Sequence, residues 1–366
     1  MMKRAIALGI LATILHAGAS AQDQTTHLEY GGHTWDVQAE RAELVTYKGK
    51  QALAIEKGGL WADDAAFSDG VISFKVAYPE HRAFIGAGWR SQDRTEFEEM
   101  YFRSHLNNTP DTVQYTPVNN GRSAWQIYAD GNALAPAVQN YDDWNEVKIV
   151  VQGDRADIYF NSDVPVLHVP DLKNDLAPGG LYLRSTNRED ATTHFADLEI
   201  RPLGANEGIE GSPKPPKPRP DGLIQTWRVS SPIAEATVAD QTVLPQNLGL
   251  TWQDMDVETN GIANLGRLYA PSESLNTVLV KTTLTVTDAQ IAEMKFGFSD
   301  RVRLYLNGDL VFAGSDGFRS RSYRFLGLIG FYDAVGLNLV PGENHIVAAV
   351  SESFGGWGWA GAVETD

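Results

Sequence analysis

Seven polar and aromatic residues on neighbouring alternating segments could together bind a hydroxylated ligand. They are Arg90, Glu99, Tyr101, Arg103, Gln114, Gln126 and Tyr128. Arginine, glutamine and glutamate side chains form paired hydrogen bonds with hydroxyl groups, and tyrosine rings lie well against the C–H faces of a sugar. These residue types therefore favour binding of a neutral carbohydrate.

Alternation assigns these residues to one face of a predicted sheet. In EFEEMYFRS (96–104), Met100 and Phe102 point one way, while Glu99, Tyr101 and Arg103 point the other way. The same reasoning places Arg90 on the face opposite Ile85 and Trp89, and Gln114 on the face opposite Val113 and Tyr115. It also places Gln126 and Tyr128 opposite Trp125 and Ile127. We expect an exposed polar face and Trp125 in the core. The alternative is an ordinary solvated sheet face on which Glu99 and Arg103 pair with each other.

A second aromatic group lies near the C-terminus. In SESFGGWGWAG (351–361), glycines 355, 356 and 358 surround Trp357 and Trp359. Glycines let the backbone turn sharply, so both indoles are predicted at an exposed rim where a sugar ring could stack. The alternative is that Trp357 fills the end of a β-sandwich.

The sequence predicts no catalytic residue. Glycosidases need two carboxylates about 5–9.5 Å apart, but Glu96 and Glu98 share the side of Met100, and the Glu-x-Asp-x-x-Glu spacing of many sandwich-fold glucanases is absent. Lyases that act on acidic sugars use an Arg or Gln with a Tyr and His pair. Arg103, His105, Gln114 and Tyr115 supply these types, yet Gln114 and Tyr115 face opposite sides.

The elements that position these residues are almost all predicted as short β-strands in antiparallel sandwiches. Alternating runs occur at 67–79, 83–90, 96–104, 111–118, 123–130, 145–161 and 194–202, between Gly, Pro, Asn and Asp clusters. Gln152-Gly153-Asp154 and Asn307-Gly308 predict tight hairpins. Only Asp288 to Lys295 has the character of a helix.

Composition divides the chain into four parts. Residues 1–21 have the charged, apolar and small-residue regions of a secretory signal peptide, which predicts a periplasmic or secreted protein. Five prolines between 213 and 220 predict an extended linker at 203–222. We therefore expect two antiparallel β-sandwich (jelly-roll) domains, at 22–202 and 223–366.

Charge and residue usage limit the partners. The chain has a formal net charge of −17 and contains no cysteine. Such an acidic surface disfavours nucleic acid and polyanionic glycans unless basic residues are locally focused. After the signal, no stretch is apolar and long enough for membrane insertion. No cofactor is expected, although the SDG segments at 68–70 and 315–317 are compatible with a structural calcium ion.

Several segments resemble known families. GAGWRSQDRTEFEEMYFRSH, NTPDTVQYTPVNNGRSAWQIY and HFADLEIRP resemble concanavalin A-like lectin/glucanase domains and, more distantly, the keto-disaccharide hydrolase type. This resemblance implies a jelly-roll sandwich whose concave sheet often holds a glycan. FGFSDRVRLYLNGDLVFAG and LNLVPGENHIVAAVSESFGGWGW are similar to galactose-binding-like jelly rolls.

The prediction is thus a secreted, non-catalytic carbohydrate-binding protein that recognises a neutral oligosaccharide or polysaccharide on the concave sheet of its first sandwich. Two alternatives stay open: a glycan-active hydrolase or lyase, and an envelope scaffold that contacts other proteins.

Overall fold

The computed structural model describes residues 26–175, 177–187, 190–317 and 328–365. The predicted signal peptide at 1–21 lies outside these residues. The described chain is nearly all β, with two 3-10 turns, η1 (Glu235–Thr237) and η2 (Leu265–Arg267). Within the described residues, no helix has the length and hydropathy needed to cross a membrane.

Residues 27–201 form one antiparallel sheet of 14 strands, called here the N-terminal sheet. Its main path runs β12-β11-β10-β4-β14-β3-β13-β5-β6-β7-β8. The strands are β1 (His27–Tyr30), β2 (His33–Tyr47), β3 (Lys50–Phe67), β4 (Gly70–Ala77), β5 (Ala83–Ser91), β6 (Phe97–Arg103), β7 (Val113–Asn119), β8 (Arg122–Ser123), β9 (Leu134–Ala135), β10 (Asn145–Gln152), β11 (Arg155–Phe160), β12 (Leu167–Val169), β13 (Gly179–Asn187) and β14 (Thr193–Arg201).

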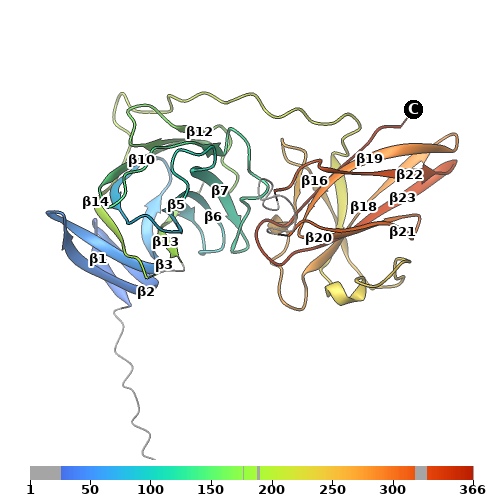
Figure 1. Cartoon of the computed structure of the whole chain (residues 1–366), viewed down its shortest axis with the longest axis horizontal. Helices are drawn as coiled ribbons and strands as arrows, with labels where there is room; N and C mark the ends of the chain where they lie inside the picture. The colour runs from blue at the N-terminus through green and yellow to red at the C-terminus, as the bar shows by residue number, and fades with distance from the viewer. Residues whose placement is uncertain (1–25, 176, 188–189, 318–327, 366) are drawn as a thin grey trace, which may run out of the picture.

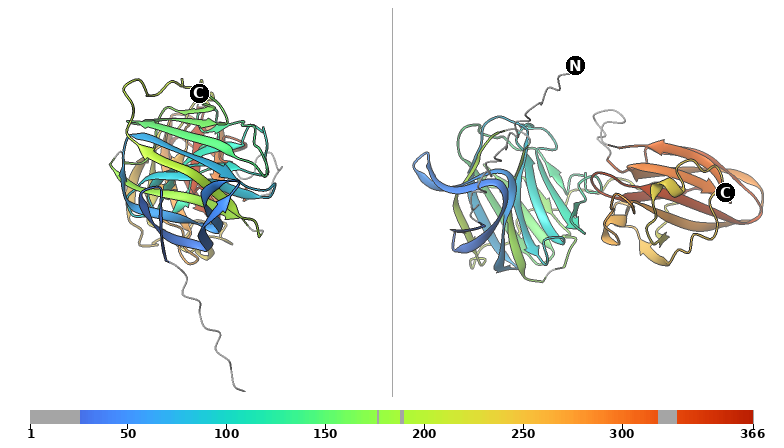
Figure 2. Two further views of the ribbon diagram at one scale, coloured as in Figure 1. Left: turned by 90° about the vertical axis from the view of Figure 1, so that its left-hand side faces the viewer. Right: turned by 90° about the horizontal axis from the view of Figure 1, so that it is seen from below.

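This sheet curls so that its two halves face each other across a hydrophobic core (Figures 1 and 2). Phe102 on β6 packs edge-on against Phe160 on β11, with ring centroids 4.9 Å apart. Both rings are buried, so strands distant in the sheet form opposite layers of one sandwich.

Residues 226–363 form two further antiparallel sheets, called the C-terminal sheets. One has the order β16-β15-β18-β23-β20-β21 and the other β17-β24-β19-β22. Their strands are β15 (Thr226–Ser230), β16 (Trp252–Asp256), β17 (Ala263–Asn264), β18 (Thr277–Val286), β19 (Gln290–Ser299), β20 (Arg301–Leu306), β21 (Asp309–Ser315), β22 (Asp333–Leu339), β23 (Gly342–Ser351) and β24 (Gly358–Val363). A second hydrophobic core fills the space between them. The all-β prediction is confirmed.

Local turn chemistry was predicted correctly, but the helix was not. Asn307 and Gly308 have φ of 52° and 96° and join β20 to β21, and Gly153 has φ of 60° between β10 and β11. The helix predicted at Asp288 to Lys295 is wrong, because most of that run belongs to β19. Burial of Ala292, Met294, Phe296 and Phe298 follows the period of two that a strand requires.

Residues 203–222 form neither helix nor strand and run beside both sets of sheets (Figure 1). Asn132 is hydrogen-bonded in both directions to the backbone of Lys214, at 2.7 and 3.0 Å. The ammonium of Lys217 donates to the Ala129 carbonyl at 3.2 Å. The proline-rich segment is therefore held against a loop of the N-terminal sheet.

Candidate functional site

The antiparallel register brings four of the seven predicted residues together on the outer face of β6 and β7. Tyr101 lies between Gly86 on β5 and Gln114 on β7, and Glu99 lies between Gly88 and Thr116. Met100, Phe102 and Tyr115 enter the core instead. Glu99, Tyr101, Arg103 and Gln114, with Arg184 from β13, are called here the outer-face cluster.

The cluster consists of two hydrogen-bonded groups that meet at the Tyr101 ring. The Tyr101 hydroxyl donates to Gln114 Oε1 at 3.0 Å, and Arg103 Nη2 donates to both groups, at 3.2 Å to the hydroxyl. Arg184 Nη1 donates to Glu99 Oε1 at 2.6 Å. The guanidinium carbons of Arg184 and Arg103 lie 5.0 and 5.1 Å from the Tyr101 ring centroid, which is within cation–π range.

The expectation that this face is openly exposed is wrong. Tyr101, Arg103 and Gln114 are only 2%, 8% and 1% exposed. Gln114 is covered by the turn at 124–128, because its Nε2 donates to the carbonyls of Trp125 and Tyr128 at 2.9 and 2.8 Å. Most of the cluster therefore lies below the molecular surface. Its charged member nearest the solvent is Arg184, whose side chain is 19% exposed.

Aromatic residues lie around the outer-face cluster, of which Phe84 and Tyr182 are half-buried and Trp61 and Phe97 are buried. Phe84 stands edge-on to Tyr101 and to His105, with centroids 5.6 and 5.8 Å apart. Tyr182 stacks on Trp61 at 4.1 Å, and Trp61 packs against Phe97. The half-buried Phe84 ring thus lies beside Arg184, whose guanidinium carbon is 5.8 Å from the ring centroid.

His105 is held neutral beside this cluster. Burial, followed by the positive charges of Arg82 and Arg103, lowers the pKa of its imidazole to about 4. The imidazole is therefore neutral at pH 7, and among the described residues its buried Nδ1 has no hydrogen-bond partner.

Sequence reasoning missed Phe84, Trp61, Tyr182 and Arg184 as site residues. The run GGLYLRS (179–185) alternates in the same way as 96–104, and this signal could have placed Tyr182 and Arg184 on one face. What it could not show is that β13 lies directly beside β5.

Arg90 does not join the cluster, which corrects the prediction. It has φ of 55°, and between the pairs Gly180–Ser91 and Tyr182–Gly88 strand β5 contains one more residue than β13. This β-bulge interrupts the alternation. The buried guanidinium instead donates to Asp69 at 2.9 Å and to the carbonyls of Ser68 and Gly153 at 3.1 and 2.7 Å.

Gln126 and Tyr128 also lie elsewhere, because residues 125–127 form a turn and not the predicted strand. Gln126 Oε1 accepts from Gly356 N at 2.6 Å and its Nε2 donates to Ser299 Oγ at 3.1 Å. The Tyr128 hydroxyl donates to Glu258. Both residues therefore connect the N-terminal sheet to the C-terminal sheets. Trp125, predicted in the core, is half-buried.

Trp357 and Trp359 are 1% and 0% exposed in the C-terminal core, so the prediction that glycines leave them exposed is wrong. Trp359 packs edge-on against Trp227 with centroids 5.6 Å apart, and Trp357 Nε1 donates to the Val350 carbonyl at 3.2 Å. The alternative, that Trp357 fills the end of the sandwich, agrees with this burial.

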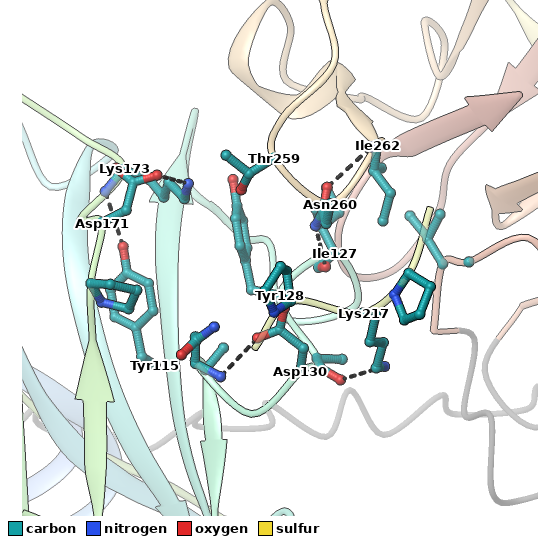
Figure 3. A pocket seen from close by; sticks show the side chains of 18 of the residues that line it. Tyr115, Ile127, Tyr128, Asp130, Asp171, Lys173, Lys217, Thr259, Asn260 and Ile262 are labelled. Atoms are coloured by element: carbon teal, nitrogen blue, oxygen red, sulfur yellow. Dashed lines mark hydrogen bonds and ion pairs between the residues drawn. The ribbon is translucent and has the colours of Figure 1, made fainter. Parts of the chain in front are cut away.

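A pocket of about 310 Å³ opens at the junction near Tyr128 (Figure 3). Its walls come from the N-terminal sheet, the proline-rich segment and the C-terminal sheets. Asn260 Nδ2 donates to the Ile127 carbonyl at 3.0 Å, and Lys173 N donates to the Tyr115 hydroxyl at 3.0 Å. These bonds tie the walls together.

No group of three or more His, Asp or Glu side chains within the described residues could hold a metal ion. Asp69, from the first SDG segment, accepts from Arg90 and from the Gly153 amide at 3.1 Å. Its carboxylate therefore already has protein donors.

Residues 23–201, which carry the N-terminal sheet, match the family model of a 3-keto-alpha-glucoside-1,2-lyase-like domain. This segment thus matches a carbohydrate-active family. No curated protein matches the chain.

Several solved structures are similar to part of the chain. A carbohydrate-binding module from Bacillus subtilis is 17% identical, covering 45% of this chain and 94% of that chain with a TM-score of 0.33. A glycosyl hydrolase described as putative in Parabacteroides distasonis is 14% identical, with coverage of 46% and 93% and a TM-score of 0.32. A Bacillus licheniformis β-glucanase is 10% identical, with coverage of 48% and 83% and a TM-score of 0.27.

Proposed function

We propose that the outer face of β13, β5 and β6 binds a neutral glycoside above the outer-face cluster. The observation that carries this proposal is the position of Arg184, which is ion-paired with Glu99, stacked over Tyr101 and still partly open to solvent. An arginine in this position can donate hydrogen bonds to sugar hydroxyls without first being ordered, which limits the entropy lost on binding.

The aromatic border gives the second element of sugar recognition. Phe84 and Tyr182 are half-buried, so their exposed portions can lie against the C–H face of a sugar ring. Tyr101, Arg103 and Gln114 then act as positioning residues below the ligand. The family match of residues 23–201 supports a carbohydrate ligand.

The geometry disfavours cleavage by a glucanase-type carboxylate pair. Glu98 and Glu99 are neighbours in sequence but point to opposite faces of β6, because Glu98 accepts from the Tyr115 hydroxyl at 2.7 Å inside the core. Burial raises the pKa of Glu98. A proton donor in that position faces away from the proposed ligand.

A second candidate function is elimination from a 3-keto glucoside, which the family match of residues 23–201 favours. A ketone at C3 acidifies the C2–H bond, so a base can remove that proton while the C1–O bond breaks and a C1–C2 double bond forms. The proton goes to the departing oxygen. His105 would be the base, and Arg103 and Arg184 would stabilise the negative charge that develops on the ketone oxygen.

Calorimetric titration of the protein with neutral oligosaccharides and with 3-keto glucosides tests the binding proposal. We expect Arg184→Ala to weaken binding about tenfold, since a hydrogen bond to a charged donor contributes about 1.5–3 kcal/mol. Arg155→Ala, on the exposed end of β11, is the matched control and should bind normally. Absence of binding to every sugar of both classes would reject the proposal.

Product analysis separates the two candidates. Binding without turnover supports the non-catalytic function, whereas release of an unsaturated keto sugar that is lost in His105→Asn supports elimination. Product formation that survives this substitution would rule out His105 as the base.

We also propose that residues 1–21 direct export, and that the mature protein consists of two sandwich domains, 22–202 and 223–366, joined by the segment 203–222. Mass spectrometry of the periplasmic and secreted fractions should find a mature N-terminus near Gln22. An intact N-terminus in the cytoplasm alone would contradict export.

A further inference from the structure

A groove of about 830 Å³ crosses the outer face of the six-stranded C-terminal sheet, on the side away from the C-terminal core. Strands β15, β18 and β23 form its floor, and the loop at 244–250 forms one wall. Strand register places Arg228 beside Lys281, and Thr283 beside His345. Adjacent strands lie about 4.8 Å apart, so these side chains share one small area.

The groove concentrates positive charge in a strongly acidic protein. Among the described residues that line it, Arg228, Lys281 and His345 are basic and none is Asp or Glu. The whole chain, by contrast, contains 47 acidic residues against 30 Lys and Arg. A locally positive groove with low-dielectric walls attracts anions even when the overall charge is negative.

Lys281 is the best placed of these basic residues. Its ammonium lies 3.7 Å from the centroid of Trp252, and within the described residues no carboxylate lies within ion-pair distance of it. Partial burial, followed by the charge of Arg228, lowers the pKa of Lys281. The negative charge of a ligand would offset both effects, because it favours the charged form of Lys281.

Acidic residues do approach the edge of the groove. Asp254 pairs with Arg228 at 3.4 Å, and Asp256 accepts from Thr226 at 2.6 Å, both on the edge strand β16. Arg228 is therefore partly neutralised. The charge argument therefore depends on Lys281. His345, whose Nδ1 is bonded to Thr283 at 3.1 Å and whose ring is exposed, adds a polar group to the groove.

We propose that this groove binds an anionic saccharide, meaning a sugar with carboxylate or sulfate groups. Besides the cations, it presents exposed neutral hydrogen-bonding side chains that suit sugar hydroxyls, namely Gln246, Asn247, Thr283 and Asn307. The volume lies within the usual range for small-molecule sites. This site is separate from the outer-face cluster and does not depend on the function proposed for that cluster.

Titration of the full protein with oligogalacturonate, a sulfated galactan oligosaccharide and a neutral galactan oligosaccharide tests the proposal. We expect one or both anionic ligands to bind more tightly than the neutral one, with affinity falling as salt increases. Lys281→Gln should weaken this binding about tenfold. Lys295→Gln, an exposed lysine on β19, should have no effect.

Several outcomes would overturn the proposal. These are equal affinity for the neutral oligosaccharide, no binding of either anionic ligand, or binding that Lys281→Gln leaves unchanged. Inorganic sulfate that binds as tightly as the sulfated oligosaccharide would show a simple anion site without sugar recognition. Binding that is lost in Arg184→Ala would place the ligand on the N-terminal sheet instead.

Discussion

Arg184 and Glu99 form an ion pair whose acidic partner is almost fully buried. Glu99 is 1% exposed, and its Oε1 accepts from Arg184 at 2.6 Å. A buried carboxylate that loses its only cationic partner keeps the cost of desolvation without the compensating attraction. Removal of Arg184 alone should therefore destabilise the fold, because it leaves the buried charge of Glu99 uncompensated.

We expect Arg184→Met to lower the free energy of unfolding by about 3–5 kcal/mol, and the double variant Glu99→Gln/Arg184→Met to recover a large part of this loss. Urea denaturation of the single and double variants measures the difference. Single effects that simply add in the double variant would show that the two side chains do not interact energetically.

Because Glu352 is buried, we expect the free energy of unfolding to depend on pH. This residue is buried at the end of β23, where desolvation and the nearby charge of Asp300 raise its pKa to about 8. The folded state therefore holds this proton more tightly than the unfolded state between pH 4.5 and about 8. The stability that Glu352 contributes is present below pH 4.5 and is lost as the pH rises through that window.

Glu352→Gln removes this titration. The free energy of unfolding of this variant should equal that of the natural protein near pH 4.5. At pH 8 it should be higher by about 2–4 kcal/mol. Thermal unfolding of both proteins across pH 4.5–8 checks this, with Glu343→Gln, an exposed residue of β23, as the control. A constant difference across the range would contradict the raised pKa.

At the scale of elements, strand β5 shapes the proposed binding face through its glycines. A Cβ built on Gly86 would lie 2.0 Å from the Met100 carbonyl oxygen and 2.6 Å from the Tyr101 Cα. The backbones of β5 and β6 are thus too close here for any side chain. Gly86 thus allows β6, which carries Tyr101, to lie close to β5.

We expect Gly86→Ala to destabilise the fold by more than about 2 kcal/mol and to weaken glycoside binding, because β6 must move away. Gly336→Ala on β22 is the matched control, since its Cβ would meet only Ile291 at an ordinary 3.5 Å. Chemical denaturation compares the two variants. Equal stability would show that β6 can move without cost.

Where the strands are regular, alternation in the sequence predicted correctly which face of the sheet each side chain occupies. It separated Glu99, Tyr101, Arg103 and Gln114 from Met100, Phe102 and Tyr115, as the structure has them. It failed at Arg90, where a β-bulge shifts the period, and at 123–130, where contacts with the C-terminal sheets replace a strand by a turn. Both failures arise from tertiary contacts, which local pattern does not encode.

The dependence on tertiary contacts also explains why the exposure of Trp357 and Trp359 was predicted wrongly. Glycines around Trp357 and Trp359 are compatible with an exposed rim or with a close approach of backbone and ring, and sequence alone did not decide between them. A Cβ on Gly361 would lie 2.7 Å from Trp227, so in this region the small residue makes space for an indole from another strand. Such packing depends on which strands face each other.

At the scale of the whole molecule, the N-terminal sheet and the C-terminal sheets share a packed junction. Ile262, Ile329 and Ala360 belong to the same buried cluster as the core of the N-terminal sheet. Polar groups form hydrogen bonds across the junction as well. Asn264 Nδ2 donates to Asn119 Oδ1 at 3.2 Å, and Gly356 N donates to Gln126 Oε1 at 2.6 Å. Association of the two parts therefore does not depend on the proline-rich segment alone.

This leads to a prediction for a chain cut in that segment. With a protease site inserted after Pro218, the two fragments should stay together during size-exclusion chromatography, because separation would expose apolar surface and unpaired buried polar groups. Gln126→Ala removes both side-chain bonds of Gln126 to Ser299 and Gly356, so the cut variant should dissociate at higher concentration than the cut parent. Gln246→Ala, in the distant loop of the anion groove, should not change dissociation. Fragments of the cut parent that elute separately would show that the segment 203–222, and not the junction, holds the two parts of the molecule together.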